Sequence, residues 1–274
     1  MFKRNYSSGL FQLFAICLGL VIIFPITYAL CISLMEANQI LSVTPTIIPR
    51  KITFDSYKQA MTLTTIGRYM INSFIIAGAS SVIRIITASM AAFAFAFFTF
   101  KGRDALFMMC VGTIMIPADV VLVTNYKTVA QLGLINTYLG AMIVFFVSAL
   151  NIFMMRQYFL TFSKSLKEAA FIDGCSNFRF FIQILLPTAK PVIATVFISA
   201  FIGTWNTYLW PMLVTNDNSM RTVQVGITML NFPDGTVYGP IMAASILVLL
   251  PSLFIFIFFQ KRIVSGMMVG SVKG

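Results

Sequence analysis

Six long apolar stretches limit what this chain can fold into. They cover about residues 10–34, 69–99, 105–125, 138–160, 191–214 and 239–260. Each reaches the roughly 20 residues that a helix needs to cross a hydrocarbon core of about 30 Å. An isolated strand in lipid would leave its backbone groups without partners, so helix is the local structure open to such runs. The pattern predicts an all-α, polytopic membrane protein with six transmembrane helices.

The composition supports this fold class. Only 10% of the 274 residues are charged, against about 25% in soluble domains, so most apolar side chains must face lipid. Lys3 and Arg4 precede the first stretch as in a secretory signal, but the run from Leu10 to Leu34 is longer than the apolar core of such a signal. We therefore interpret it as a retained first span.

The basic residues predict the orientation. The net charge is +11, and Lys and Arg occupy short gaps between apolar runs instead of one wettable face, so a nucleic-acid partner is not expected. With the N-terminus in the cytoplasm, the loops that lie inside carry the excess of basic residues. Both termini are therefore expected in the cytoplasm. Because no internal repeat stands out, residues 1–274 are interpreted as one transmembrane permease domain.

The residues that catalysis or metal binding requires are scarce. The chain has no His, and Cys17, Cys31, Cys110 and Cys175 are too widely spaced for a metal knuckle. It also has no G-x-x-x-x-G-K-[ST] loop to hold a nucleotide phosphate. We expect a non-enzymatic chain that binds no metal or cofactor itself and draws its energy from another polypeptide.

The most informative segment is a cytosolic loop, about residues 163–190. Ser165 followed by Glu168 fits a capping box at a helix start, and Gly174 fits a helix end. A second helix is predicted from Asn177 to Leu185, ended before Pro187. Two short helices joined by a glycine turn would form a compact protrusion that another protein could grip.

A small-residue notch is expected on the first of these helices. Ala169 and Ala170 lie between Leu166 and Phe171, and two methyl groups would let a partner backbone approach closely. Lys164, Lys167 and Glu168 would keep the helix at the membrane surface.

The spacing in this loop resembles the EAA loop of binding-protein-dependent ABC importer permeases. The matching residues are Glu168-Ala169-Ala170, Asp173-Gly174, Phe178, Ile184 and Leu186-Pro187. Cys175 stands where that family often has Ala. Further segments look like the carbohydrate-type subfamily, and in particular like the shorter, six-span partner typified by the second permease of the maltose transporter. These segments are Ile48-Pro49, Phe54–Tyr57, Asn72-Ser73, Ile116-Pro117, Leu132–Tyr138, Trp205-Asn206, Trp210-Pro211 and Val272–Gly274.

The resemblance implies an ABC importer permease fold and a mechanism. In that family the EAA helix sits in a groove of a cytosolic ATPase, and ATP-driven closure of the ATPase dimer rocks two permeases between inward-facing and outward-facing states. The partners implied are a second permease in a heterodimer, two ATPase protomers that bind ATP and Mg, and an extracytoplasmic substrate-binding protein that delivers a sugar. The chain would lie in the cytoplasmic membrane of a prokaryote. Residues with an implied ATPase-coupling role are Glu168, Ala169, Ala170, Asp173, Gly174, Leu186 and Pro187.

Two further groups are candidates for a role in transport. Trp205, Asn206, Tyr208 and Trp210 cluster toward the outer half of the fifth stretch, where an amide and aromatic faces suit a sugar, although a membrane-interface belt has the same composition. The tail Val272-Lys273-Gly274 either meets lipid headgroups or, as the resemblance implies, reaches the ATPase interface.

Two charges fall within the apolar stretches. Arg84 lies near mid-depth of the second stretch and Asp119 toward the outside of the third. A charge at membrane depth usually faces a cavity or a partner, and we expect Arg84 to contact the second permease.

Other functions remain open at this point. The transported solute could be a polyol or glycerol phosphate instead of an oligosaccharide, since the chain itself does not discriminate. A stand-alone secondary transporter would need coupling carboxylates within the spans, for which Asp119 is the candidate.

Overall fold

The computed structural model of the protein describes residues 6–42, 46–63, 65–232, 235–236 and 238–268. Its contacts divide the chain into two compact units. Unit 1 comprises residues 1–67 and 226–251, and unit 2 comprises residues 68–225 and 252–274. Each unit is described by itself.

Unit 1 contains the N-terminal helix, the segments that follow it, and the chain around the start of α15. Its elements are α1 (Tyr6–Ser33), α2 (Ala37–Ile40), α3 (Asp55–Leu63), the antiparallel pair β1 (Asn231–Phe232) and β2 (Gly235–Thr236), and the first part of α15 (Tyr238–Met268). Asp55 begins α3, where an acidic residue in the first turn is favourable. Pro233 and Asp234 lie outside the described residues.

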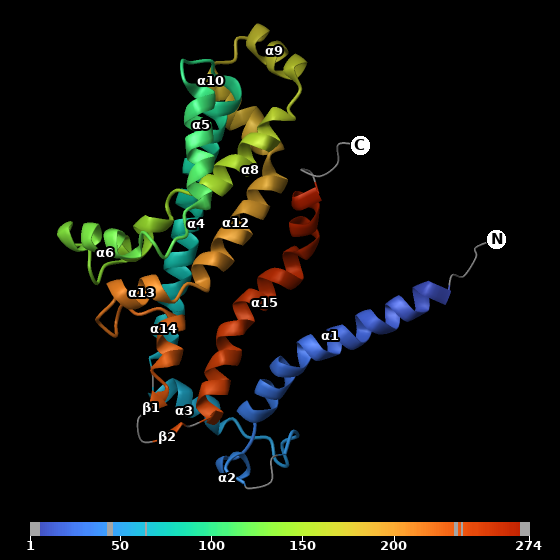
Figure 1. The fold of residues 1–274 in the computed structure, drawn as a ribbon, viewed down its shortest axis with the longest axis vertical. Coiled ribbons are helices and arrows are strands. Elements are labelled where there is room, and N and C mark those ends of the chain that lie inside the picture. The colour runs from blue at the N-terminus through green and yellow to red at the C-terminus, as the bar shows by residue number, and fades with distance from the viewer. Residues whose placement is uncertain (1–5, 43–45, 64, 233–234, 237, 269–274) are drawn as a thin grey trace. The chain divides into compact units, whose positions relative to one another are not determined.

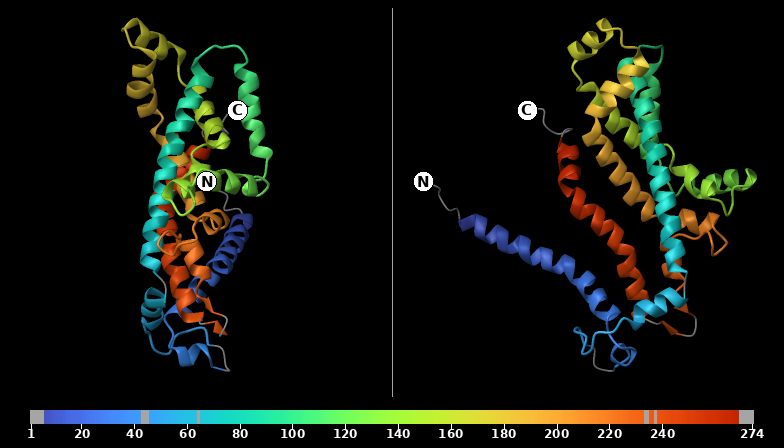
Figure 2. Two further views of the ribbon diagram at one scale, coloured as in Figure 1. Left: turned by 90° about the vertical axis from the view of Figure 1, so that its left-hand side faces the viewer. Right: turned by 180° about the vertical axis from the view of Figure 1, so that it is seen from behind.

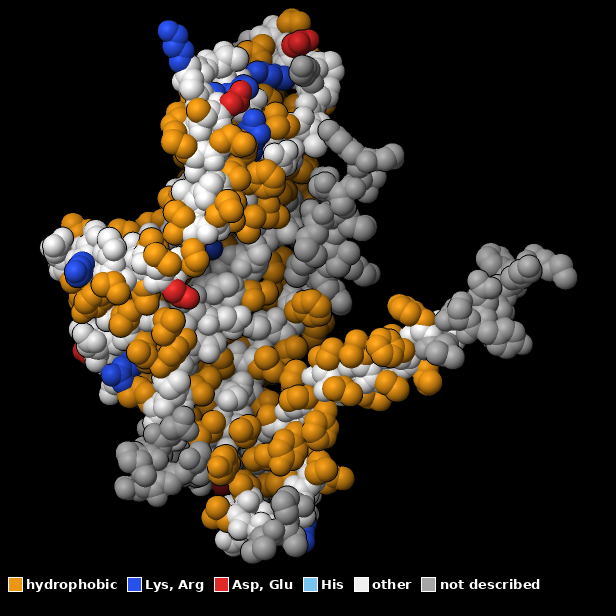
Figure 3. All heavy atoms as spheres, in the orientation of Figure 1, with side chains coloured by type: hydrophobic (Ala, Val, Ile, Leu, Met, Phe, Trp, Pro, Cys, Tyr) orange, Lys and Arg blue, Asp and Glu red, His pale blue; other side chains and the backbone are white. Residues whose placement is uncertain are grey.

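A small core closes unit 1 near the start of α15. Gly239 lies so close to α3 that a Cβ there would be 2.5 Å from Ser56 Oγ. Ala243 and Ala244 on the next turns are fully buried. In contrast, the most hydrophobic part of α1, within Phe11–Ser33, is not buried inside the structure, and orange side chains cover this helix in Figure 3. Such a helix buries its surface in lipid or against another chain.

Unit 2 is organised along α4 (Ile66–Phe97), which runs its length in Figures 1 and 2. The other long elements are α5 (Arg103–Gly112), α6 (Leu122–Gln131), α8 (Ala149–Leu160) and α12 (Lys190–Trp205). Shorter elements are η1 (Thr113–Met115), α7 (Tyr138–Met142), η2 (Ile143–Phe145), α9 (Lys164–Ile172), α10 (Asn177–Arg179), η3 (Phe180–Leu185), α11 (Leu186–Thr188), α13 (Leu209–Val214) and α14 (Val223–Thr228), the last continuing into unit 1.

Long apolar helices are present, as the sequence predicts. Among the described residues, three are long and apolar enough to cross a membrane: Phe11–Ser33, Ile66–Phe97 and Tyr238–Phe259. Two bent pairs bring the total to as many as five if each pair is one span: Tyr138–Phe145 with Ala149–Leu160, and Asn177–Thr188 with Lys190–Trp205. The count of six spans stays a prediction.

The third apolar stretch is not one helix. α5 and η1 end at Met115, and Ile116 adopts an extended backbone immediately before Pro117. The residue before a proline is disfavoured in helical geometry, which explains the break. α6 begins only at Leu122 and has a separate amphipathic pattern.

Two apolar cores hold unit 2 together. One joins α4, α8, α12 and the loop of α9 and α10, with Ala92, Met155 and Phe180 fully buried. The other joins α4, α6, α7 and α13 around Trp210 and Val214. The first core therefore reaches the loop that carries the sequence motif, and it fixes the base of that loop on α4 and α8.

Candidate functional site

α9 begins two residues earlier than the sequence suggested. Ser163, not Ser165, occupies the position before the helix, and its side chain makes no capping bond. The two serine hydroxyls lie 2.7 Å from each other. The predicted capping box of Ser165 and Glu168 is therefore wrong, because Ser165 already lies inside the first turn and its hydroxyl is engaged with Ser163.

The predicted end of α9 at Gly174 is confirmed. Gly174 has φ +78°, in the left-handed region where a side chain is strained. The Cys175 N–H donates to the Ala170 carbonyl at 2.9 Å, and the Gly174 N–H donates to the Phe171 carbonyl at 3.1 Å. These two bonds form a Schellman motif. The chain is thereby reversed sharply toward α10.

The second helix of the loop runs further than predicted. Asn177–Thr188 is continuous, so it passes through Pro187 before it meets α12 at 77°. Residues Phe180–Leu185 form a π-helical segment, whose wider turns accommodate a residue that has no N–H to donate. The predicted end before Pro187 is therefore wrong by one turn.

Phe180 anchors this loop on the spans. Its side chain is fully buried. Its ring lies 5.6 Å from Phe97 at the end of α4, 5.6 Å from Phe162 after α8, and 5.9 Å from Phe171 on α9. Sequence reasoning missed this role, although the Phe-x-Phe-Phe run after the glycine turn was a visible signal. The Phe180 ring therefore packs α9 against the ends of α4 and α8.

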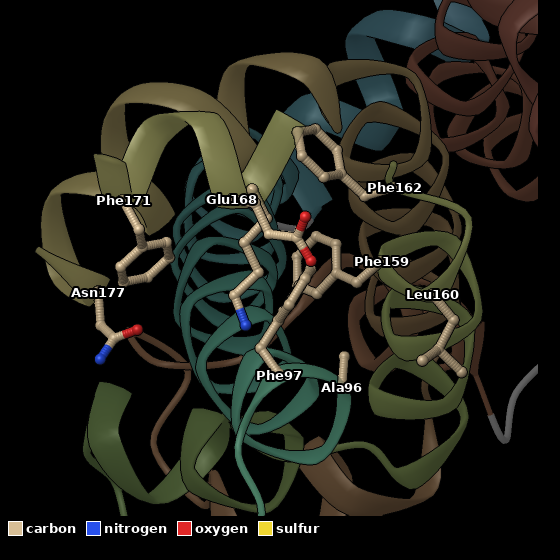
Figure 4. A pocket seen from close by; sticks show the side chains of 9 residues that line it. Ala96, Phe97, Phe159, Leu160, Phe162, Glu168, Phe171 and Asn177 are labelled. Carbon is tan, nitrogen blue, oxygen red and sulfur yellow. The ribbon is translucent and has the colours of Figure 1, made fainter. Parts of the chain in front are cut away.

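A pocket of about 480 Å³ lies beneath α9. Figure 4 shows Glu168 and Phe171 of α9 facing Phe97 and Phe159 across it. The other lining residues are Ala96, Leu160, Phe162, Lys167 and Asn177. The Lys167 ammonium lies 5.0 Å from the centre of the Phe97 ring and 5.6 Å from that of Phe171. Lys167 therefore fastens α9 to α4 by cation–π contact as well as carrying charge.

The two alanines of the motif face opposite ways. Ala170 is only 7% exposed and packs into the core with Phe180, whereas Ala169 is exposed. The predicted notch made by both methyl groups is therefore wrong. Along α9, Leu166, Ala169 and Ile172 recur every three residues on the accessible side.

These accessible residues form an apolar patch at the tip of unit 2. Leu166 is 58% exposed, Ile172 86%, and Phe178 on α10 73%. Together with Ala169 they are called the α9–α10 patch below. Lys and Arg side chains gather at the same end of the unit in Figure 3. Large exposed apolar side chains among charges are typical of a protein-binding surface.

The remaining motif residues differ in exposure. Glu168 and Asp173 are exposed, Leu186 is half-buried, and Pro187 is exposed on the helix that follows. The side chain of Lys164 and the tail Val272-Lys273-Gly274 lie outside the described residues.

The four residues proposed for a sugar pathway do not share one environment. Trp205 is 2% exposed, with its ring 4.7 Å from that of Phe74, and Trp210 is 4% exposed in the second core. Only Asn206 and Tyr208 are accessible. Sequence reasoning missed Gln224, whose Nε2 donates to Asn206 Oδ1 at 3.4 Å across 18 residues of sequence.

Two exposed carboxylates outside the spans have lowered pKa values. The pKa of Asp104 is lowered mainly by the hydrogen bond from Arg103, and further by its positive charge. The pKa of Asp217 is lowered by hydrogen bonds from the Ser219 backbone and side chain. Both groups are therefore ionised at neutral pH. Among the described residues, no group of three or more His, Cys, Asp or Glu side chains could hold a metal.

Comparison with known proteins gives a consistent set of similarities. The model of the family described as "Binding-protein-dependent transport system inner membrane component" matches residues 5–269. The sn-glycerol-3-phosphate transport system permease protein UgpE of Rhizobium meliloti (strain 1021) is 35% identical over 274 residues, covering 97% of each chain. The arabinooligosaccharides transport system permease protein AraQ of Bacillus subtilis (strain 168) is 33% identical, covering 96% of this chain and 94% of its own.

Solved structures share the fold. A chain of a bacterial ABC transporter involved in the import of the acidic polysaccharide alginate superposes with a TM-score of 0.85 at 22% identity, covering 95% of this chain and 99% of its own. A chain of the bacterial alginate ABC transporter in complex with a pentasaccharide-bound periplasmic protein gives 0.65 at 18% identity, covering 95% and 98%.

Proposed function

The chain belongs to the family of binding-protein-dependent transport system inner membrane components, and from that premise we propose that it is the permease subunit of an ABC importer that carries a carbohydrate across the cytoplasmic membrane of a prokaryote. The six spans, both termini in the cytoplasm and the treatment of residues 1–274 as one permease domain are parts of this proposal. The chain itself is a transport component; hydrolysis of ATP with Mg is assigned to a separate ATPase.

The α9–α10 patch carries the proposal. Its apolar residues project from a short helix pair that is held at its base by Phe180 and Lys167. A helix pair of this kind can transmit a displacement of its exposed end, because its other end is packed against the spans. We assign the tip to a groove of the cytosolic ATPase, so that closure of the ATPase dimer moves α4 and α8 through α9.

The motif residues receive distinct roles in this proposal. Glu168, Ala169 and Asp173 would contact the ATPase directly, because they are exposed. Gly174 sets the turn, and Ala170 lets α9 approach the core. Leu186 and Pro187 shape the bend into α12.

The substrate is assigned as an oligosaccharide or a related sugar. Permeases for arabinooligosaccharides and for sn-glycerol-3-phosphate are among the relatives. Asn206 and Tyr208 offer an amide and an aromatic face that suit sugar hydroxyls and ring faces. The pathway would be completed by a second permease, and an extracytoplasmic binding protein would deliver the solute. The tail Val272–Gly274 is proposed to reach the ATPase interface.

Uptake of labelled sugars by cells that depend on this permease tests the coupling role. We expect Gly174→Asp and Glu168→Lys each to lower uptake by about tenfold or more, as loss of about 1–3 kcal/mol of coupling would, while the protein still inserts. Gly174→Asp strains the left-handed turn, and Glu168→Lys reverses a charge at the interface.

Asp104→Lys is the matched control. It also reverses an exposed carboxylate outside the spans, but Asp104 lies at the start of α5 and its partner is Arg103. Uptake by this control should stay near the wild-type value. Normal uptake with both motif variants would rule out the coupling role. Labelled sn-glycerol 3-phosphate, measured in parallel, distinguishes the sugar from the phosphorylated solute.

A further inference from the structure

The fourth apolar stretch bends without a residue that forces it to bend. Its two arms, Tyr138–Phe145 and Ala149–Leu160, meet at 51°. The intervening residues Phe146-Val147-Ser148 include neither proline nor glycine. Ser148 caps the second arm by accepting from the Asn151 N–H at 3.4 Å, but a cap only starts a helix. Sharp kinks arise from Pro, from Gly or Ser pairs, or from a side chain that enters the hydrogen-bond ladder.

Two side chains of α4 donate hydrogen bonds to backbone carbonyls at this bend. Arg84 Nε donates to the Phe145 carbonyl at 2.6 Å, and Thr87 Oγ1 donates to the Phe146 carbonyl at 2.6 Å. In an unbroken helix these carbonyls would accept from the N–H groups four residues on. Arg84 and Thr87 are three residues apart and so share a face of α4. That spacing lets them serve two consecutive carbonyls.

Arg84 places a positive charge inside an apolar helix, which is energetically unfavourable unless other groups contact the charge. Arg84 lies near the middle of the apolar helix Ile66–Phe97, and charges at such depth are unfavourable. The ion pairs found among the described residues, Lys51 with Glu36 and Arg103 with Asp104, do not involve it. Its guanidinium instead lies 5.7 Å from the centre of the Phe145 ring. Nε therefore has its acceptor within the chain; contact of the guanidinium with a second permease stays a prediction.

We propose that Arg84 is a positioning residue which, together with Thr87, holds the bend between α7 and α8. The bend fixes the start of α8 on α4, while the end of α8 reaches the pocket beneath α9 through Phe159 and Leu160. α8 is thus tied to α4 at both ends. A displacement of α9 then moves α4 and α8 as one body instead of straightening the fourth stretch. The part of this inference that concerns transport rests on the proposed function.

A distance across the bend tests the clamp directly. Spin labels are placed at Leu139 and Leu160, which are 44% and 50% exposed, in the full chain with its four native cysteines replaced by Ser and reconstituted in lipid. Removing the donor with Arg84→Leu should straighten the stretch and lengthen the distance by about 3 Å, given 1.5 Å per residue over two arms that meet at 51°. An unchanged distance would overturn the clamp.

Conservative replacements keep the test valid if Arg84→Leu does not accumulate. Arg84→Lys retains a cationic donor and should retain the bend; Thr87→Ser should do the same, whereas Thr87→Val should lengthen or broaden the distance distribution. Arg68→Leu is the matched control, because Arg68 Nε also donates to a backbone carbonyl, that of Ser219 at 3.3 Å, but at the exposed start of α4. Equal distances in Thr87→Val and Thr87→Ser would count against the proposal.

Coupling is measured separately as ATP hydrolysed per sugar taken up by the assembled importer. We expect this ratio to rise at least about fivefold in Arg84→Leu, within the usual range of coupling free energies, and to return toward wild type in Arg84→Lys. If the fourth apolar stretch straightens in Arg84→Leu but the ATP hydrolysed per sugar is unchanged, the proposed role of Arg84 in transport is overturned. If the wild-type importer moves no sugar, the proposed function fails, and the distance measurement still decides the clamp.

Discussion

At the scale of single residues, Asn72 organises one end of unit 2. Its side chain is fully buried, and its Nδ2 donates to the Ser219 carbonyl at 2.8 Å and to the Arg221 carbonyl at 2.9 Å. Its Oδ1 accepts from the Tyr138 hydroxyl at 2.7 Å. One amide therefore fixes the loop after α13 and the start of α7 on α4. A buried amide with three satisfied bonds stabilises a unique arrangement.

Asn72→Leu should destabilise this end by about 2–3 kcal/mol, because two carbonyls and a hydroxyl lose their partner. Trypsin should then cleave faster after Arg221 in the loop, which gives the measurement. Asn151→Leu is the matched control: Asn151 is also buried, but its Nδ2 has no hydrogen-bond partner in the described part of the chain. Equal cleavage of the two variants would show that the Asn72 bonds do not hold the loop.

At the scale of elements, helix ends rather than helix interiors set the geometry. Thr137 caps α7 by accepting from the Gly140 N–H at 3.0 Å, and its hydroxyl donates to the Leu134 carbonyl at 2.7 Å. This places α7 directly on the turn before it. Gly140 is required there, because a Cβ would collide with the backbone carbonyl of Leu134. Helix ends also set the direction of the chain at the Gly174 turn after α9 and at the bend before α8.

Gly140→Ala should lower the stability of the purified protein by about 1–3 kcal/mol, the usual cost of overpacking. The readout is the midpoint of thermal unfolding in detergent. Gly112→Ala is the control, since Gly112 has helical backbone angles and nothing within 4 Å of its Cβ position. A midpoint that is unchanged in Gly140→Ala would mean that α7 moves away from Leu134 at no cost.

At the scale of the whole molecule, the distribution of basic residues supports the proposed orientation in the membrane. The loop of α9 and α10 carries the coupling motif and basic residues, and the loop between α13 and α14 belongs to the other side in the proposed topology. The number of spans does not follow from helix length alone, because the third apolar stretch is interrupted at Pro117 and two other candidate spans are bent pairs.

Single cysteines test this topology. In a cysteine-free background, an impermeant maleimide applied to intact cells should label Asn216→Cys, in the loop after α13, and should leave Thr161→Cys, just before α9, unlabelled until the cells are opened. Both positions are exposed, so access alone does not separate them. The reverse labelling pattern would contradict the orientation, and labelling of both in intact cells would contradict the assignment of the two loops to opposite sides.

Much of the candidate site could be predicted because its signals are local. The two helices around the Gly174 turn follow from the backbone preferences of a few neighbouring residues. The errors at Ser165 and Pro187 are also local. In each case the sequence allowed two helix boundaries one or a few residues apart, and a neighbouring hydroxyl or a π-helical segment selected the other one.

By itself the sequence determined which segments are apolar, where Gly174 ends a helix, and which family its spaced motif resembles, since each depends on residues close together in the chain. Only the tertiary structure decided that Ala170 faces the core while Ala169 is exposed, that Trp205 and Trp210 are buried, and that Arg84 holds a bend. The physical reason is that burial and hydrogen-bond partners depend on contacts between distant segments. Periodicity shows that a helix has a buried side, but packing determines which neighbour covers it.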